Sequence, residues 1–230
     1  VAIGNVVVSP SEFMPRLFAE NGRLLDSQGR ITLDTPEALR ALENYRETYS
    51  YSDRTIYDFW KNALEGFADG TAAMTVVFIN YASHILNSQM SRIAGKLGFA
   101  PVPGGKPLLG GGVIGITQSC TCPAAACKFL EWLYADLVAP VFTMLGGLSP
   151  CRSAYSNRDI SEQYPWLSTA RKSFPTAQRR SNSTYYQNFS ELQLETILAA
   201  HVQQAVLGVC SPEEALKQAQ EDCNRYFQPW

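Results

Sequence analysis

The chain has 230 residues, of which 46% are hydrophobic and 17% charged, and its formal net charge at pH 7 is −2. This length and apolar content suffice for one large domain or two small domains with buried cores. The weak net charge and the lack of long basic runs argue against a nucleic-acid-binding surface, and the apolar runs are shorter than the roughly 18 residues that span a membrane.

The first third of the chain predicts three helices and a small hairpin. Ser9-Pro10-Ser11-Glu12 is typical of a capping box and predicts a helix that ends near Asn21-Gly22. The turn residues around Gly29 predict a hairpin over residues 24–33. Thr35-Pro36-Glu37 predicts the cap of the second helix, and residues 53–69 predict the third.

Apolar runs predict the strands. Residues 1–8 favour a strand that enters the domain, and the continuous run 72–78 predicts a strand that is covered on both faces. Further strands are expected at 97–102 and 113–116. Before the last of these, Gly110–Gly112 present no side-chain barrier, so the backbone there can turn sharply or pass close to another group.

The second half predicts mainly helices. Pro123 begins one, and a glycine-proline loop follows at residues 146–152. Residues 190–207 predict an amphipathic helix, and Ser211-Pro212-Glu213-Glu214 predicts the capping box of the last helix. The buried face of the Pro123 helix is expected to consist of Ala126, Phe129, Leu130, Leu133 and Leu137.

Neither a metal, a cofactor nor a catalytic site is predicted. Cys120-x-Cys122-x4-Cys127 is not a zinc-binding spacing. No nucleophile, phosphate-binding or dinucleotide-binding motif is present. His84 and His201 are interpreted as structural residues, and we expect no enzymatic activity.

The order and spacing of several motifs resemble a known family. Phe67-x-x-Gly70-x-Ala72-Ala73-Met74 is followed by G-F-A-P-V-P-G-G at residues 98–105, by Gly110-Gly111-Gly112, and by A-x-x-K-F-L-E-W-L at residues 125–133. This series resembles the extracellular solute-binding proteins of ABC importers, in the carbohydrate-binding family 1 that includes maltose-binding protein. The resemblance covers about residues 13–219.

This resemblance implies an α/β fold of the periplasmic-binding-protein-like type II, with mainly the second of its two lobes present. Relatives carry a substantial first-lobe segment before the region that this chain resembles. By analogy, residues 1–103 and 151–230 form the second lobe, and residues 104–150 hold the hinge crossings and a remnant of the first lobe. A remnant of one strand and one helix cannot bury its apolar face alone, so it must dock on the second lobe, pair with another chain or stay loose.

Sugar binding calls for aromatic rings that stack on C–H faces and for planar polar groups that hydrogen-bond hydroxyls. Asn80 and Tyr81 follow the central run at the place where the resembled family puts an aromatic residue toward its cleft. Tyr185 and Tyr186 precede the 190–207 helix, and Arg152 lies in the return loop. We expect these five residues, with Gly111 and Gly112, to contact the ligand, while a role in the core remains the alternative for the tyrosines and a hinge role for the glycines.

The resemblance implies the substrate-binding component of an ABC transporter, which binds a carbohydrate or similar polar solute and presents it to a membrane permease. Such a protein is extracellular or periplasmic and attached to the cell surface. The scattered cysteines leave an alternative open, in which the same fold is the ligand-sensing domain of a cytoplasmic transcriptional regulator. A glycoside-processing enzyme is a third option, for which no catalytic pair of carboxylates is found.

Overall fold

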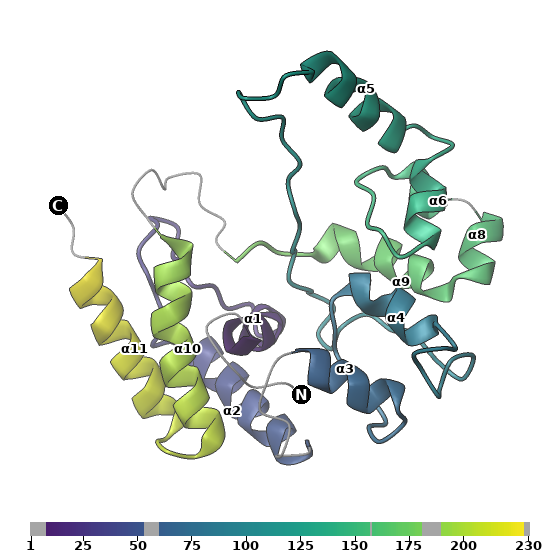
Figure 1. Cartoon of the computed structure of the whole chain (residues 1–230). Helices are drawn as coiled ribbons and strands as arrows, with labels where there is room; N and C mark the ends of the chain where they lie inside the picture. The colour runs from purple at the N-terminus through teal and green to yellow at the C-terminus, as the bar shows by residue number, and fades with distance from the viewer. Residues whose placement is uncertain (1–7, 53–59, 157, 181–189, 228–230) are drawn as a thin grey trace.

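The computed structural model of the chain describes residues 8–52, 60–156, 158–180 and 190–227. Helices dominate the described residues, and Figure 1 shows them in two groups with α5 standing apart. The helices are α1 (Val8–Ala19), α2 (Pro36–Ser50), α3 (Trp60–Ala68), α4 (Ala82–Leu86), α5 (Pro123–Leu133), α6 (Ala139–Met144), α7 (Ser153–Ser156), α8 (Arg158–Gln163), α9 (Pro165–Ser173), α10 (Glu191–Leu207) and α11 (Pro212–Tyr226), with short 3-10 turns η1 (Ile79–Tyr81) and η2 (Phe174–Thr176).

Two of the three predicted helix caps form as expected, whereas Ser9, which was expected to cap the first helix, already lies inside α1. The Thr35 hydroxyl accepts a hydrogen bond from the Ala38 amide at 3.2 Å at the start of α2. At the start of α11, the Ser211 hydroxyl accepts from the Glu214 amide at 3.1 Å, and the Glu214 carboxylate accepts from the Ser211 amide at 3.0 Å. These bonds satisfy amides that have no partner inside the helix, so the capping box predicted from the sequence is confirmed.

The small hairpin is also confirmed. Leu25 and Ile31 form an antiparallel bridge, and the Asp26 amide donates to the Arg30 carbonyl at 2.9 Å. Gly29 closes the turn with φ of 79°, a conformation that favours glycine. Leu24, Leu25 and the neighbouring Leu33 are buried, so the hairpin adds to the core beside α2.

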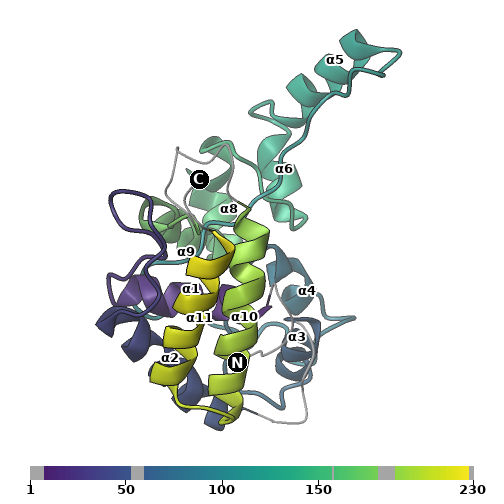
Figure 2. The ribbon, with the colours of Figure 1, turned by 90° about the vertical axis from the view of Figure 1, so that its left-hand side faces the viewer.

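The first core is formed by α1, α2, α10 and α11, which Figure 2 shows packed together. Their apolar faces follow helical spacing, as Leu42, Tyr45 and Tyr49 do in α2. The largest fully buried side chains of this core are Phe13, Met14, Leu17, Leu33, Leu42, Tyr45, Leu194, Leu198 and Leu216. Sequence segments about 150 residues apart therefore build one core.

The second core joins α4, α6, α7 and α9. Its buried residues are Ala82, Ala139, Ala154, Tyr155, Trp166, Leu167 and Ala170. Ala139 of α6 therefore packs in the same core as residues of α7 and α9, although α6 lies within the 104–150 range that was assigned to the hinge and the first-lobe remnant. The assignment of lobes to residue ranges stays a prediction.

The strand predictions are wrong for the described residues. Residues 72–78, 97–102 and 113–116 form no strand, and the α/β expectation is met there only by two isolated bridges. Met74 is 85% exposed, so the 72–78 run is not covered on both faces. A strand requires a neighbour to accept and donate its backbone hydrogen bonds, and the described residues supply none for these runs. Residues 1–7 of the first predicted strand lie outside the described residues, and Val8 is already helical.

The buried face predicted for the Pro123 helix is wrong as well. The helix forms as α5, but none of its residues is buried, and Phe129 is 56% exposed. Leu137 lies beyond the end of α5 and is also exposed. The helix forms where its apolar spacing predicts it, but the described residues do not bury its apolar side chains. No helix in the described part of the chain combines the length and apolarity that crossing a lipid bilayer requires.

Candidate functional site

Two segments cross between the helical groups and pair with each other. Leu108 and Gln178 form a parallel bridge, in which the Gln178 amide donates to the Pro107 carbonyl at 2.9 Å and the Leu109 amide donates to the Gln178 carbonyl at 2.7 Å. We define residues 107–109 and 178 as the crossing pair. It is the centre of the candidate site because predicted site residues follow it in both segments, Gly111 and Gly112 in the first and Tyr185 and Tyr186 in the second.

The three glycines that follow the crossing pair lie in a segment without regular secondary structure. None of Gly110–Gly112 has a positive φ, so they form no left-handed turn. A Cβ placed on Gly110 would lie 3.4 Å from the Phe78 ring, which is an ordinary van der Waals contact, so no close approach requires a glycine at this position. A Cβ on Gly111 or Gly112 would meet no described atom within 4 Å, which leaves their peptide groups open to a ligand.

Asn80 and Tyr81 lie in η1, directly after Phe78. The Tyr81 amide donates to the Phe78 carbonyl at 3.0 Å, which makes the chain turn at this point. Asn80 is exposed, whereas Tyr81 is half-buried and packs in a small cluster with Phe78 and Ala63. The protein therefore covers Tyr81 only in part, and its predicted ligand contact stays a prediction.

The return loop that carries Arg152 packs beside the same turn. Gly146 has φ of 95° and leaves no room for a side chain, because a Cβ there would overlap Ser83. Ser83 in turn donates a hydrogen bond to the Asn80 carbonyl at 3.4 Å. These contacts bring the loop of Arg152 next to η1, two segments that are about 70 residues apart in the sequence.

The loop is held firmly while the Arg152 side chain is exposed. The Tyr155 hydroxyl donates to the Ser149 carbonyl at 2.8 Å, and the Cys151 amide donates to the Ser149 hydroxyl at 3.1 Å. Burial raises the pKa of Tyr155, so this phenol stays protonated and keeps its donor. Arg152 is therefore exposed on a loop that hydrogen bonds hold in place. Its planar guanidinium is suited to donate two parallel hydrogen bonds to one partner.

A partly buried ion pair beyond the crossing pair was not predicted from the sequence. Arg180 Nε lies 3.1 Å from Glu195 Oε1, and Arg180 Nη2 donates to the Ser11 hydroxyl at 2.8 Å. Glu195 is only 5% exposed, although it belongs to α10, and its Oε1 has no hydrogen bond from a described residue. We call Ser11, Arg180 and Glu195 the polar cluster.

Burial raises the pKa of Glu195, while the nearby Arg180 lowers it and Glu191 raises it further. An acidic side chain beside Leu194 and Leu198, on the apolar face of a predicted helix, was the signal in the sequence that could have revealed this cluster. The polar cluster connects α1, through Ser11, to α10, through Glu195. Arg180 lies between them, two residues beyond the crossing pair.

Tyr185 and Tyr186, the remaining predicted ligand residues, lie outside the described residues. They follow Arg180 of the polar cluster by a few positions and precede Ser190, the cap of α10. Their role stays a prediction. Of the seven predicted residues, the structure thus places Asn80, Tyr81 and Arg152 in neighbouring segments, and Gly111 and Gly112 next to the crossing pair.

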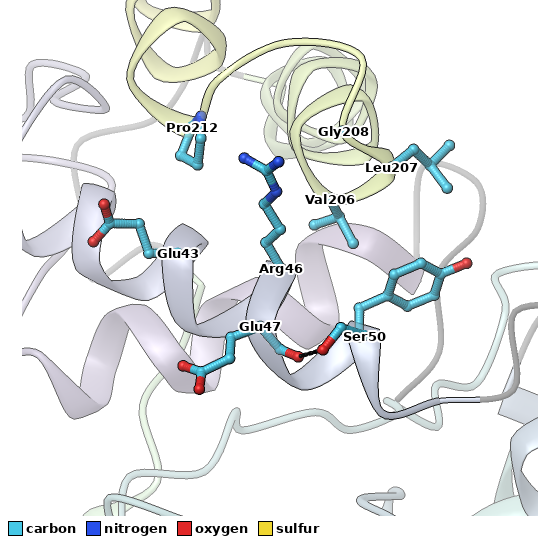
Figure 3. A pocket seen from close by; sticks show the side chains of 9 residues that line it. Glu43, Arg46, Glu47, Ser50, Val206, Leu207, Gly208 and Pro212 are labelled. Carbon is cyan, nitrogen blue, oxygen red and sulfur yellow. Dashed lines mark hydrogen bonds between the residues drawn. The ribbon is translucent and has the colours of Figure 1, made fainter.

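A pocket of about 640 Å³ lies elsewhere, between the end of α2 and the turn from α10 to α11 (Figure 3). Its wall includes Arg46, whose side chain points between Gly208 and Pro212 in Figure 3, with Glu43 and Glu47 nearby. None of the predicted ligand residues lines it. We do not assign the ligand to this pocket.

Other polar residues singled out in the sequence have structural surroundings. His201 Nε2 lies 2.9 Å from the Asp222 carboxylate, which links α10 to α11. All six cysteines are free thiols, and Cys122 and Cys127 are exposed at the start of α5. Within the described residues, no three side chains among His, Cys, Asp and Glu are grouped in a way that would hold a metal ion.

Comparison with known proteins identifies the relatives of this chain. The sequence model of a family described as "Bacterial extracellular solute-binding protein" matches residues 9–169. The maltose-bound protein MalE3 of T. maritima superposes with a TM-score of 0.78 at 22% identity, covering 98% of this chain and 60% of that chain. At this identity the likeness shows only that this chain shares the fold of the matched part of that protein.

Two further solved structures are similar. An ABC transporter solute-binding protein of Agrobacterium radiobacter K84 in complex with ribitol has a TM-score of 0.76 and 23% identity, covering 99% of this chain and 59% of that chain. An ABC transporter solute-binding protein of Thermotoga lettingae bound to alpha-D-tagatose has a TM-score of 0.70 and 26% identity, covering 97% and 59%. This chain therefore spans about 60% of the length of the relatives that it matches.

Proposed function

Because the chain belongs to the family of bacterial extracellular solute-binding proteins, we propose that it is part of the substrate-binding component of an ABC transporter and binds a sugar or polyol. The observation that carries this proposal is the family match over residues 9–169, which includes the crossing pair residues 107–109 and the segments of Asn80 and Arg152. The solved relatives with bound maltose, ribitol and tagatose support a neutral, hydroxyl-rich ligand.

The proposed ligand site lies around the crossing pair. Asn80 and Arg152 supply planar polar groups, and the open peptide groups of Gly111 and Gly112 supply further hydrogen bonds. Tyr81 supplies an aromatic face, and Tyr185 and Tyr186 remain candidates for further stacking. In this assignment residues 1–103 and 151–230 form the second lobe, and residues 104–150 contain the crossings and a first-lobe remnant.

The mechanism follows from a site between two lobes. A ligand that touches both lobes binds the closed state better than the open state, so it shifts the population toward closure. The closed form is what a membrane permease would receive. We therefore place the protein outside the cytoplasm, attached to the cell surface, and assign it a binding role without catalysis.

The alternative function, a ligand-sensing domain of a cytoplasmic regulator, has one observation in its favour. All six cysteines are free, which suits a reducing compartment. The description of the matched family as extracellular favours the transporter component instead. The two functions differ in location, so a cell-fractionation experiment that finds the protein in the cytoplasm would support the regulator.

The proposed function is tested by thermal unfolding of the complete substrate-binding component, with both lobes, against a panel of sugars and polyols that includes maltose, ribitol, mannitol and tagatose. A ligand that binds only the folded state stabilises it by about 2.7 kcal/mol at a concentration of 100 Kd. A rise in Tm with members of one ligand class supports the proposal. A Tm that is unchanged by every sugar and polyol in the panel contradicts it.

A further inference from the structure

The first segment of the crossing pair is fastened to the C-terminal end of α1. The Lys106 ammonium group donates a hydrogen bond to Oδ1 of Asn21, just after the last residue of that helix. Asn21 has φ of 63°, a conformation that asparagine tolerates better than most residues, and its side chain adds a contact that glycine would lack. A Cβ on Gly104 would overlap Ala19, so the backbone of the segment also lies against α1.

The second segment is fastened to the N-terminal half of α1 and to α10. Nη2 of Arg180 donates to the Ser11 hydroxyl at 2.8 Å, Nη1 donates to Glu195 Oε2 at 3.4 Å, and Nε lies 3.1 Å from Glu195 Oε1. Ser11 and Glu195 are both buried, so Arg180 is attached to the packed faces of two helices. The single ammonium group of a lysine could not make these three contacts at once.

The crossing pair closes these contacts into a ring. Gln178 joins the second segment to the first through two backbone hydrogen bonds, of 2.9 and 2.7 Å. We call α1, residues 104–109 and residues 178–180 the frame. Gly111 and Gly112, whose open peptide groups belong to the proposed ligand site, follow the frame directly after one further residue. Their position therefore depends on how firmly the frame is held.

We propose that Arg180 is a positioning residue for ligand binding. It fastens the second segment to α1 and α10, and through the crossing pair it holds the segment from which Gly111 and Gly112 reach the ligand. The ligand is the sugar or polyol of the function proposed above, on which this role of Arg180 depends. A site that is ordered before the ligand arrives loses less conformational entropy on binding, so its affinity is higher. The hydrogen bond from Lys106 to Asn21 acts in the same way from the first segment.

Two substitutions each remove one fastening at little cost to α1 itself. Ser11→Ala removes the acceptor of Arg180 Nη2, and alanine has a higher helix propensity than serine. Asn21→Gly removes the acceptor of Lys106, and glycine adopts the positive φ of this position without strain. The two variants thus loosen the two segments independently.

A third variant separates the geometry of Arg180 from its charge. Arg180→Lys keeps a positive charge beside Glu195 but cannot also reach Ser11. We call these three substitutions the frame variants. Thr196→Ala is the matched control, because the exposed Thr196 hydroxyl donates to the Leu192 carbonyl of its own helix, outside the frame.

Hydrogen exchange in the 230-residue chain without ligand measures the frame directly. The amides of Leu109 and Gln178 donate the two hydrogen bonds of the crossing pair, and NMR follows each amide. We expect the frame variants to speed exchange at both amides by about two- to tenfold, which corresponds to the loss of one hydrogen bond. Exchange at the buried amides of α10 and α11 should not change, and the control should exchange like the unsubstituted chain.

Isothermal titration of the complete substrate-binding component, with both lobes, measures the effect on affinity. The titrant is whichever of maltose, ribitol, mannitol and tagatose raises Tm in the thermal screen. We expect each frame variant to raise Kd by about two- to tenfold, and the control to leave Kd unchanged. A purely structural role of Arg180 would instead lower the Tm of the unliganded protein and leave Kd unchanged.

Three results would overturn the proposal. Unchanged exchange of both amides in all frame variants would show that these contacts do not hold the crossing pair. Faster exchange with an unchanged Kd would show that the frame does not position the ligand site. If none of the four compounds binds the unsubstituted component, the proposed function fails and the ligand role of Arg180 fails with it. The exchange rates do not depend on a ligand, so they distinguish that failure from the absence of the frame.

Discussion

Arg180, two residues beyond the crossing pair, forms a partly buried ion pair with Glu195, in which Nε and Oε1 lie 3.1 Å apart. The Arg180 side chain is 29% exposed and that of Glu195 only 6%. The pair therefore joins the segment that crosses between the helical groups to α10. Through the hydrogen bond from Arg180 to Ser11, it also joins that segment to α1.

Replacing Arg180 by Ala should destabilise the protein because it leaves the Glu195 carboxylate buried without a counter-ion. We expect a loss of about 2 kcal/mol in the free energy of unfolding, between the values typical of exposed and of fully buried pairs. Urea denaturation measures this loss. The double variant Arg180→Ala/Glu195→Gln should be more stable than Arg180→Ala alone, and equal stabilities would show that the unpaired Glu195 carboxylate carries no such penalty.

Titration of Glu195 should make the free energy of unfolding depend on pH. Burial, the largest cause, raises the pKa of this carboxyl above its ordinary value of 4.5 in the folded state. The folded protein then binds a proton more readily than the unfolded chain does, so the contribution of Glu195 to stability is fully present below pH 4.5 and is lost as the pH rises through the raised pKa.

Glu195→Gln cannot titrate, so it should remove this loss. Urea denaturation of both proteins from pH 4 to pH 7 checks the prediction. The stability of the unsubstituted protein is expected to fall relative to that of the variant as the pH rises. A difference that stays constant over this range would show that the pKa of Glu195 is not raised.

Gly104 and Gly105 provide a matched test of a close backbone contact. Both have positive φ, 81° and 66°, so alanine should cost about 1–2 kcal/mol at either position. A Cβ on Gly104 would also overlap Ala19 at the end of α1, whereas one on Gly105 meets no described atom within 4 Å. Gly104→Ala should therefore lower the free energy of unfolding by at least 1 kcal/mol more than Gly105→Ala. Equal losses would show that the turn can move away from α1.

Local signals in the sequence predicted helices better than they predicted strands. The caps at Thr35 and Ser211 are decided within four residues by hydrogen bonds that the sequence itself specifies, and both form. The run 113–116 has a strand sequence, but a strand also needs neighbours, and nothing local reveals whether they are present. For the same reason the apolar spacing of α5 was predicted correctly and its burial was not.

The candidate site shows the same division. Asn80, Tyr81 and Arg152 were selected from a family resemblance, and contacts between Gly146 and Ser83 bring their segments together. The polar cluster was missed because its members come from residues 11, 180 and 195, and only folding makes them neighbours. Glu195, the partner of Arg180, lies on the buried apolar face of α10.

Thiol reactivity should separate the cysteines by burial. Cys223 is fully buried, and burial, with the nearby Asp222 charge, raises the pKa of its thiol to about 12. At pH 8 only about one thiol in ten thousand would be ionised, so Cys223 should react with Ellman's reagent only on unfolding. Cys122 and Cys127 are exposed and should react within minutes in the native protein. Rapid reaction of Cys223 in native buffer would contradict its place in the first core.

Arg152 should contribute to ligand binding without contributing to stability. Its guanidinium is exposed on a loop that is held by Tyr155 and Ser149, so Arg152→Ala should leave the free energy of unfolding unchanged to within about 0.5 kcal/mol. If the guanidinium donates to ligand hydroxyls, the same change should weaken binding by about 1.5–3 kcal/mol, the worth of hydrogen bonds to a charged group. Isothermal titration with the ligand identified by the thermal screen measures this loss.

Arg158→Ala is the control, because Arg158 is an exposed arginine that pairs with Glu162 on α8. Equal affinities of the Arg152 and Arg158 variants would remove Arg152 from the ligand site.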